Sequence, residues 1–138
     1  MARRTESLPE PSDLELQVLS VLWERGPSSV REVMDAMPDG KERAYTTVLT
    51  VLQGLEKKGL ARHRRRGRQY LYSAVATRRG AVRPRLRRLI RHVFGGDPTA
   101  ALQQILNEAD VTAEDVAAMR RLLAEHATGA TKRKRGAR

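Results

Sequence analysis

The sequence contains no cysteine, and this absence excludes disulfide bonds, thiolate metal sites and cysteine nucleophiles. Aromatic residues make up only 4% of its 138 residues, with Trp23 as the single tryptophan. So few rings disfavour the binding of unpaired bases by stacking, although Tyr70 and Tyr72 would suffice for a two-residue platform. The apolar runs are too short to cross a membrane, and the N-terminus lacks the apolar core of a signal peptide. We therefore expect a cytoplasmic, soluble protein.

Acidic residues are missing from one long part of the chain. Between Lys57 and Gly96 there are fourteen lysines and arginines and no aspartate or glutamate. The whole chain has a formal net charge of +11. A basic balance of this size favours a nucleic acid or an anionic membrane surface as the partner.

Patterns typical of catalysis and metal binding are also missing. The sequence contains no evident nucleophile–base pair, carboxylate pair or phosphate-binding loop. His63, His92 and His126 do not have the mutual spacing of a metal site or a catalytic dyad. We therefore expect the protein to be neither an enzyme nor dependent on a metal or other cofactor.

Two helix starts are predicted by capping boxes, Ser12-Asp-Leu-Glu15 and Ser29-Val-Arg-Glu32. The first opens a helix whose apolar stripe continues to about Arg25, where Gly26-Pro27 ends it. The second opens a short helix that Pro38-Asp-Gly40 stops.

A third helix is predicted from about Ala44 to Lys58, because apolar residues recur along one side of it. Its outer side carries short polar residues: Thr46, Thr47, Thr50 and Gln53. β-Branched threonines lower helix propensity, so this row indicates contact with a ligand rather than a plain solvated face. Threonine offers its hydroxyl to base edges or phosphate and its methyl group to thymine. We expect this helix to read DNA bases in a major groove.

A basic β-hairpin is predicted after this helix, with its turn at Gly67 and its second strand at Gln69-Tyr-Leu-Tyr-Ser-Ala. Its arginines are Arg62, Arg64, Arg65, Arg66 and Arg68. Like charges this close repel one another, so we expect a bound anion to stabilise the hairpin and its arginines to reach phosphates or a minor groove. His63 would also touch DNA from here. Lys57 and Lys58 either contact phosphates or only compensate the helix dipole.

Three further helices are predicted in the C-terminal part. Pro84 lies inside the first, which therefore starts near Arg83 or is kinked there. Asp97-Pro98 begins the second, and Thr112-Ala-Glu-Asp115 caps the third. Their apolar stripes cannot all be buried within about fifty residues, so we expect a second copy of the chain to cover them. The expected interface residues are Leu86, Leu89, Ile90, Val93, Phe94, Leu102, Ile105, Leu106, Val116, Met119, Leu122 and Leu123.

Arg83, Arg87 and Arg91 form a stripe of like charge along the first of these helices. Two interpretations stay open for them. They pair with acidic residues of the last helix (Glu114, Asp115 and Glu125), or they add contacts to a DNA backbone.

Four runs of sequence resemble the penicillinase-repressor (BlaI/MecI/CopY) family. They are Leu14-Glu-Leu-Gln-Val-Leu-Ser-Val-Leu-Trp23, Ser29-Val-Arg-Glu-Val, Ala44-Tyr-Thr-Thr-Val-Leu-Thr-Val-Leu-Gln-Gly-Leu-Glu-Lys-Lys-Gly-Leu60 and Tyr70-Leu-Tyr-Ser-Ala. The resemblance implies an N-terminal winged helix that binds a pseudo-palindromic operator and a C-terminal helical dimerisation module. It places Thr46, Thr47 and Thr50 at the groove-facing positions of a base-reading helix, 44–58.

The resemblance also bears on regulation. Copper-sensing members carry C-terminal cysteine pairs, and the lack of cysteine here argues against copper sensing. β-Lactam-responsive members are inactivated by a protease that cuts an Asn-Phe bond in the C-terminal module. The corresponding bond here is Gln104-Ile105, which has different side chains. A regulatory protease is accordingly a further partner to consider.

We therefore expect a mainly α fold with a small β-hairpin wing: a winged helix-turn-helix domain followed by a helical dimerisation module. The expected segments are a flexible N-terminus (1–11), the DNA-binding domain (12–76), the dimerisation module (77–127) and a disordered basic tail (128–138). The residues expected to bind DNA are Arg43, Tyr45, Thr46, Thr47, Thr50, Gln53, Lys57, Lys58, Arg64, Arg65, Arg66 and Arg68.

The expected function is sequence-specific transcriptional repression by a homodimer on a double-stranded DNA operator. The main alternative is a non-specific basic architectural protein that binds nucleic acid, which would need only charge and shape and not a threonine-rich row. Binding to a membrane surface through residues 78–94 is a weaker alternative, because the apolar side of that helix serves dimerisation equally well.

Overall fold

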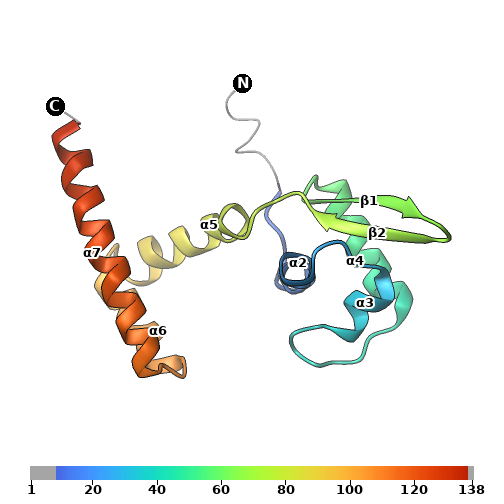
Figure 1. The fold of residues 1–138 in the computed structure, drawn as a ribbon, viewed down its shortest axis with the longest axis horizontal. Coiled ribbons are helices and arrows are strands. Elements are labelled where there is room, and N and C mark those ends of the chain that lie inside the picture. The colour runs from blue at the N-terminus through green and yellow to red at the C-terminus, as the bar shows by residue number, and fades with distance from the viewer. Residues whose placement is uncertain (1–8, 137–138) are drawn as a thin grey trace. The chain divides into compact units, whose positions relative to one another are not determined.

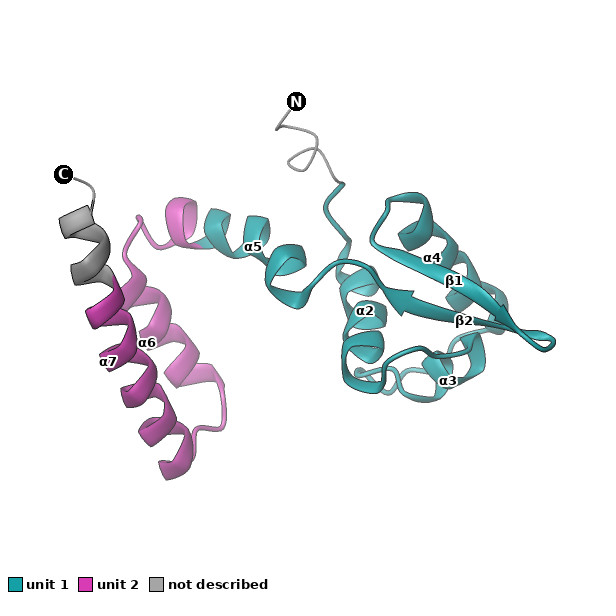
Figure 2. Cartoon of the chain, turned by 45° about the horizontal axis from the view of Figure 1, so that its top comes forward, with its two compact units in different colours: residues 1–89 teal, residues 90–138 magenta. Residues whose placement is uncertain are grey.

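The computed structural model describes the backbone of residues 9–136 and the side chains of residues 9–129 (Figure 1). The chain divides into two compact units, residues 1–89 and residues 90–138 (Figure 2). Each unit is described by itself below.

The first unit begins with three helices: α2 (Asp13–Arg25), α3 (Val30–Asp35) and α4 (Tyr45–Lys57). Both predicted capping boxes are confirmed. The Glu15 amide donates to the Ser12 hydroxyl at 3.2 Å, and the Ser12 amide donates to the Glu15 carboxylate at 2.9 Å. Ser29 and Glu32 repeat this arrangement at the start of α3. These reciprocal bonds satisfy amides that the first turn of a helix leaves unpaired.

The hairpin follows α4 directly and consists of antiparallel strands β1 (Ala61–Arg66) and β2 (Gln69–Ala74). Gly67 has a φ of +64° in the turn, a conformation that favours glycine. On its other edge β2 forms an isolated bridge between Tyr72 and Ser28. Three helices followed by this hairpin make a winged helix-turn-helix, so the predicted fold class is confirmed.

The core of the first unit joins α2, α4 and the hairpin. Leu19, Leu52 and Leu55 are completely buried, and Tyr72 is nearly so. Trp23 packs against this core, and its indole Nε1 donates to the Ala76 carbonyl at 2.8 Å. This packing fixes which side of α4 faces outward.

Helix α5 (Arg78–Arg88) starts at its N-cap Thr77, so the predicted alternative of a start near Arg83 is wrong. Pro84 lies inside the helix. A π-helical turn, η1 (Leu89–Val93), continues it. The compact units separate after Leu89, whereas the sequence suggested a boundary after residue 76. The difference arises because α5 is attached to the winged helix, with the Ala81 side chain buried in its core.

The second unit contains α6 (Pro98–Glu108) and α7 (Ala113–Gly136). Asp97 and Thr112 cap them as predicted, through bonds from the Thr99 and Asp115 amides. No helix in the described part of the chain is both long and apolar enough to cross a membrane.

The two ends of the chain differ from expectation where the structure describes them. Helix α7 continues through residues 128–136, where a disordered tail was expected, because extending an existing helix avoids the cost of nucleating a new one. Pro11 is buried and bonded to α5, although 1–11 was expected to be flexible. Residues 1–8 and 137–138 of those two segments lie outside the described residues.

Candidate nucleic-acid interface

Helix α4 separates its side chains into a buried and an exposed face. Val48, Leu52 and Leu55 are buried in the core of the first unit. The predicted outer row is exposed along its whole length: Thr46, Thr47, Thr50, Gln53 and Lys57. Packing of the apolar face therefore holds the polar row outward, available to a ligand.

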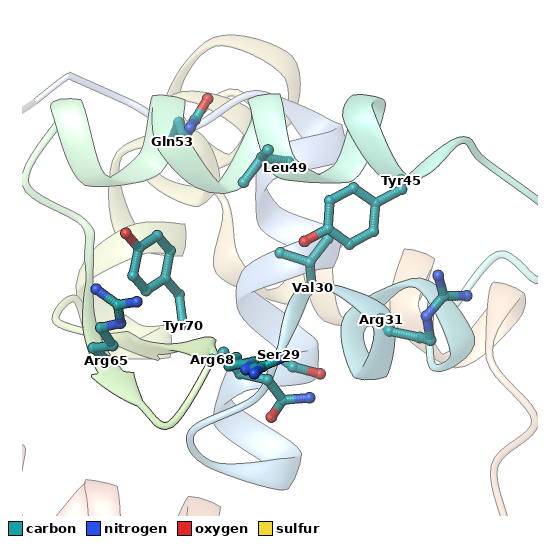
Figure 3. Close-up of a pocket in the computed structure, with 10 residues that line it drawn as sticks. Ser29, Val30, Arg31, Tyr45, Leu49, Gln53, Arg65, Arg68 and Tyr70 are labelled. Atoms are coloured by element: carbon teal, nitrogen blue, oxygen red, sulfur yellow. The ribbon is translucent and has the colours of Figure 1, made fainter.

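A cleft of about 430 Å³ lies between α4, the start of α3 and the wing (Figure 3). Tyr45, Leu49 and Gln53 line it from α4, since positions four apart share one side of a helix. Arg65 and Tyr70 line it from the wing. The full lining is Ser29, Val30, Arg31, Tyr45, Leu49, Gln53, Arg65, Arg68, Gln69 and Tyr70. None of these is acidic and three are arginines, so the cleft favours an anionic ligand.

The wing arginines divide between the two faces of the hairpin, because side chains alternate along a strand. Arg65 lies on the face of β1 that borders the cleft, and its Nε donates to the Gly67 carbonyl at 3.2 Å. Arg62, Arg64 and Arg66 alternate with it and are exposed. The wing thus presents guanidinium groups on both of its faces.

The wing is joined to α4 by a hydrogen-bonding contact that sequence reasoning missed. His63 Nδ1 on β1 lies 2.6 Å from Glu56 Oε1 on α4. The His63 ring also contacts Tyr70 and Tyr72, with ring centroids 4.6 Å and 5.2 Å apart. These contacts show that His63 supports the wing, and contact of His63 with DNA stays a prediction.

Two of the cations expected to bind DNA are paired within the first unit. Arg43 donates to both carboxylate oxygens of Asp39, at 3.0 Å and 2.7 Å, in the loop before α4. This guanidinium holds the pKa of Asp39 well below its ordinary value. Lys58 Nζ donates to Glu15 at 2.6 Å. Both cations therefore help to position α4, and a role for them in DNA binding stays a prediction.

The C-terminal part carries the apolar residues expected to form a dimer interface. Leu89, Val93, Ile105, Leu122 and Leu123 are among its exposed large side chains, and Val93 and Leu122 reach exposed fractions of 66% and 64%. Exposed apolar side chains are common on protein surfaces, so their burial by a second copy of the chain stays a prediction. The Gln104-Ile105 bond lies within α6, and both of its side chains are exposed.

The sequence matches the penicillinase repressor family over residues 11–125. The chain belongs to this family. The transcriptional regulator BlaI of Mycobacterium tuberculosis (strain ATCC 25618 / H37Rv) is 38% identical to it over 119 residues, 85% of either chain. The penicillinase repressor of Bacillus licheniformis is 22% identical over 121 residues, 88% of this chain and 94% of that protein.

Solved structures are also similar to this penicillinase repressor family member. The DNA-binding domain of the repressor BlaI aligns at a TM-score of 0.48 and 28% identity, covering 54% of this chain and 90% of that chain. Bacillus licheniformis BlaI in complex with the blaP half-operator aligns at 0.46, with the same identity and coverage. The family match and the 38% identical relative confirm the expected family, that of transcriptional repressors. Because the relatives are regulators, the expectation that the chain is not an enzyme is confirmed too.

Proposed function

We propose that this protein is a sequence-specific transcriptional repressor that binds a pseudo-palindromic operator as a homodimer. The observation that carries the proposal is the pairing of two surfaces in the first unit. The outer face of α4 presents exposed Thr46, Thr47 and Thr50, and beside it lies the cleft that it shares with the arginine-rich wing.

The two surfaces suit different parts of a DNA duplex. A major groove admits a helix, and threonine side chains on α4 would contact base edges and thymine methyl groups there. Guanidinium groups of Arg64, Arg65, Arg66 and Arg68 would contact phosphates or enter the adjacent minor groove. Phosphate contacts would set the register of the protein on DNA, and contacts from α4 would select the sequence.

A homodimer follows from the exposed apolar residues of the C-terminal part. A two-fold symmetric pair would cover the same surface on both copies, which is the commonest form of oligomer. Two recognition helices would then meet two half-sites whose centres are about 34–36 Å apart, or a multiple of that distance. The solved relative bound to a half-operator is monomeric, which suits one winged helix for each half-site.

Repression in this proposal requires no chemistry. A dimer on the promoter would exclude RNA polymerase from it, in the cytoplasm where the DNA lies. Because binding would neutralise several phosphates, affinity should fall by roughly 10³–10⁵-fold between low and moderate salt.

A protease could relieve repression only after helix α6 unfolds locally. The Gln104-Ile105 bond lies inside that helix. A protease requires an extended backbone, so it would cut this bond only after α6 opened locally. Incubation with a candidate protease, followed by mass determination of the fragments, tests this route.

A gel-shift competition separates the proposal from non-specific architectural binding. The labelled probe is a duplex selected from a random pool by the purified protein. We expect the complex to survive a large excess of random duplex and to disappear with the same excess of unlabelled probe. Equal displacement by both competitors would favour the architectural alternative.

A further inference from the structure

Helix α5 has two halves, and only the first is held by the core. The Ala81 side chain is buried among the core residues, with an exposed fraction of 4%. Pro84 has no amide hydrogen, so the Gly80 carbonyl lacks its usual partner one turn later in the helix. The hydrogen-bond ladder is therefore interrupted between the half that the core holds and the half that follows Pro84.

Close packing does not support the helix around Pro84 either. An open groove of about 710 Å³ runs beside it, lined by Leu60, by the segment 9–11 and by α5 residues that include Arg83 and Arg87. A helix interrupted by proline on an open face is free to bend, unless other contacts fix its second half.

Most of those contacts come from the segment that precedes α2, and the first residue of α2 adds a longer ion pair to Arg85, at 3.5 Å. Arg88 donates from both of its terminal nitrogens to the two carboxylate oxygens of Glu10, at 2.8 Å and 2.7 Å. Arg85 donates to the Pro11 carbonyl at 3.0 Å, and its Nε lies 3.7 Å from Glu10 Oε2. We call Glu10, Pro11, Arg85 and Arg88 the N-terminal clasp. Both of its arginines lie beyond Pro84, on the half of α5 that the core does not hold.

The clasp is itself anchored to the core of the first unit. Pro11 is buried and is followed by Ser12, the N-cap of α2. Pro9 and Pro11 flank Glu10 and limit the backbone conformations of the segment. The hydrogen bond from Arg88 lowers the pKa of Glu10, so its carboxylate is ionised at neutral pH. A bidentate pair between a guanidinium and a carboxylate is also directional, which suits it to orient a helix.

We propose that the N-terminal clasp sets the distance between half-sites that the dimer accepts, which makes Glu10 a specificity-determining residue that does not touch DNA. This inference rests on the proposed function, because it requires a homodimer on two half-sites. Helix α5 leads from the winged helix into the C-terminal unit with its exposed apolar residues. A stiff connection concentrates binding at one separation of the half-sites, whereas a flexible connection spreads it over several.

The negative charge of Glu10 argues against direct contact of this side chain with DNA phosphates. Replacing Glu10 by alanine raises the formal net charge of +11 by one, so charge alone would strengthen binding to any DNA. A changed preference among spacings would therefore report the orientation of α5 and not a lost contact.

The test uses the full chain and the selected inverted repeat, with one or two base pairs inserted or removed between the half-sites. We expect the wild-type protein to prefer one spacing by roughly tenfold or more, and the Glu10→Ala variant to prefer it by only about threefold. Glu24→Ala is the matched control. It removes an exposed carboxylate that pairs with Arg78, 2.9 Å away, on the half of α5 that precedes Pro84. The control should keep the wild-type preference.

Two results would overturn the inference, in distinguishable ways. A wild-type preference retained in Glu10→Ala would overturn the role of the clasp and leave the proposed function intact. A wild-type protein that selects no paired half-sites would overturn the proposed function together with the inference. Circular dichroism melting checks the fold of each variant. Should Glu10→Ala melt early, Glu10→Gln preserves the side-chain size and should weaken the spacing preference in the same direction.

Discussion

Lys58 and Glu15 join the end of the recognition helix to the start of α2, with Lys58 Nζ 2.6 Å from Glu15 Oε1. The same carboxylate closes the capping box with Ser12. One acidic side chain therefore caps α2 and helps to position α4. Burial alone would raise the pKa of Glu15, but the hydrogen bonds from Lys58 and Ser12 outweigh it and lower this pKa below its ordinary value of 4.5.

This lowered pKa predicts how Glu15 contributes to stability as the pH changes. A carboxyl whose pKa is depressed by folding stabilises the protein above the pKa of the unfolded chain, and this stability is lost as the pH falls through the folded pKa. We expect Glu15→Gln to lower the free energy of unfolding at pH 7 by about 1 kcal/mol. The difference from wild type should shrink between pH 5 and pH 3, as measured by urea unfolding.

Glu42→Gln is the control for this experiment, because Glu42 is an exposed carboxylate. Its free energy of unfolding should follow that of the wild-type protein at each pH. An equal deficit of Glu15→Gln at pH 7 and pH 3 would show that the charge of Glu15 does not stabilise the fold.

Thr47→Ala tests base reading by α4. Alanine has a higher helix propensity than threonine, so the helix should remain folded. We expect roughly five- to tenfold weaker binding to the selected operator and a change within about twofold on random DNA. Thr128→Ala on α7 is the control. Titration by fluorescence anisotropy on both duplexes provides the comparison, and an equal loss on the two would remove Thr47 from base reading.

Arg64→Ala tests the wing. Because a phosphate contact carries no sequence information, we expect affinity to fall by similar factors on operator and random DNA. The slope of log affinity against log salt should decrease by about one. Arg120→Ala removes the same charge from an exposed position on α7 and should leave the slope unchanged. A loss confined to the operator would mean that Arg64 reads bases instead.

Replacing Leu122 and Leu123 together by aspartate tests the dimer interface. Both side chains are exposed, so the winged helix should stay folded, whereas two buried charges would be too costly in an apolar interface. Sedimentation should show monomers. Arg120→Asp with Arg121→Asp places the same carboxylates on adjacent exposed positions and should leave the dimer in place. A dimer that survives the leucine substitutions would place the interface elsewhere.

Short-range features of this protein were predictable from its sequence. A capping box links two residues three positions apart, so Ser12 with Glu15 and Ser29 with Glu32 fixed two helix starts. The exposed threonine row was predictable from the apolar side of α4, because burial of one side of a helix leaves the opposite side exposed to solvent.

Contacts between charged side chains distant in sequence were not predictable. Lys58 bonds to a residue 43 positions away, and Arg88 to one 78 positions away. Exposed charged residues follow no periodicity, so nothing in the sequence shows which of them meet in the fold. The sequence also did not show the contact of His63 with Glu56, or the burial of Ala81 that attaches α5 to the first unit.

Selection of bound duplexes from a random DNA pool by the purified protein tests the central claim most directly. If α4 reads bases in a symmetric dimer, the recovered duplexes will share an inverted motif whose half-sites lie about 34–36 Å apart or a multiple of that distance. Recovered duplexes with no common motif, bound through charge alone, would contradict the account.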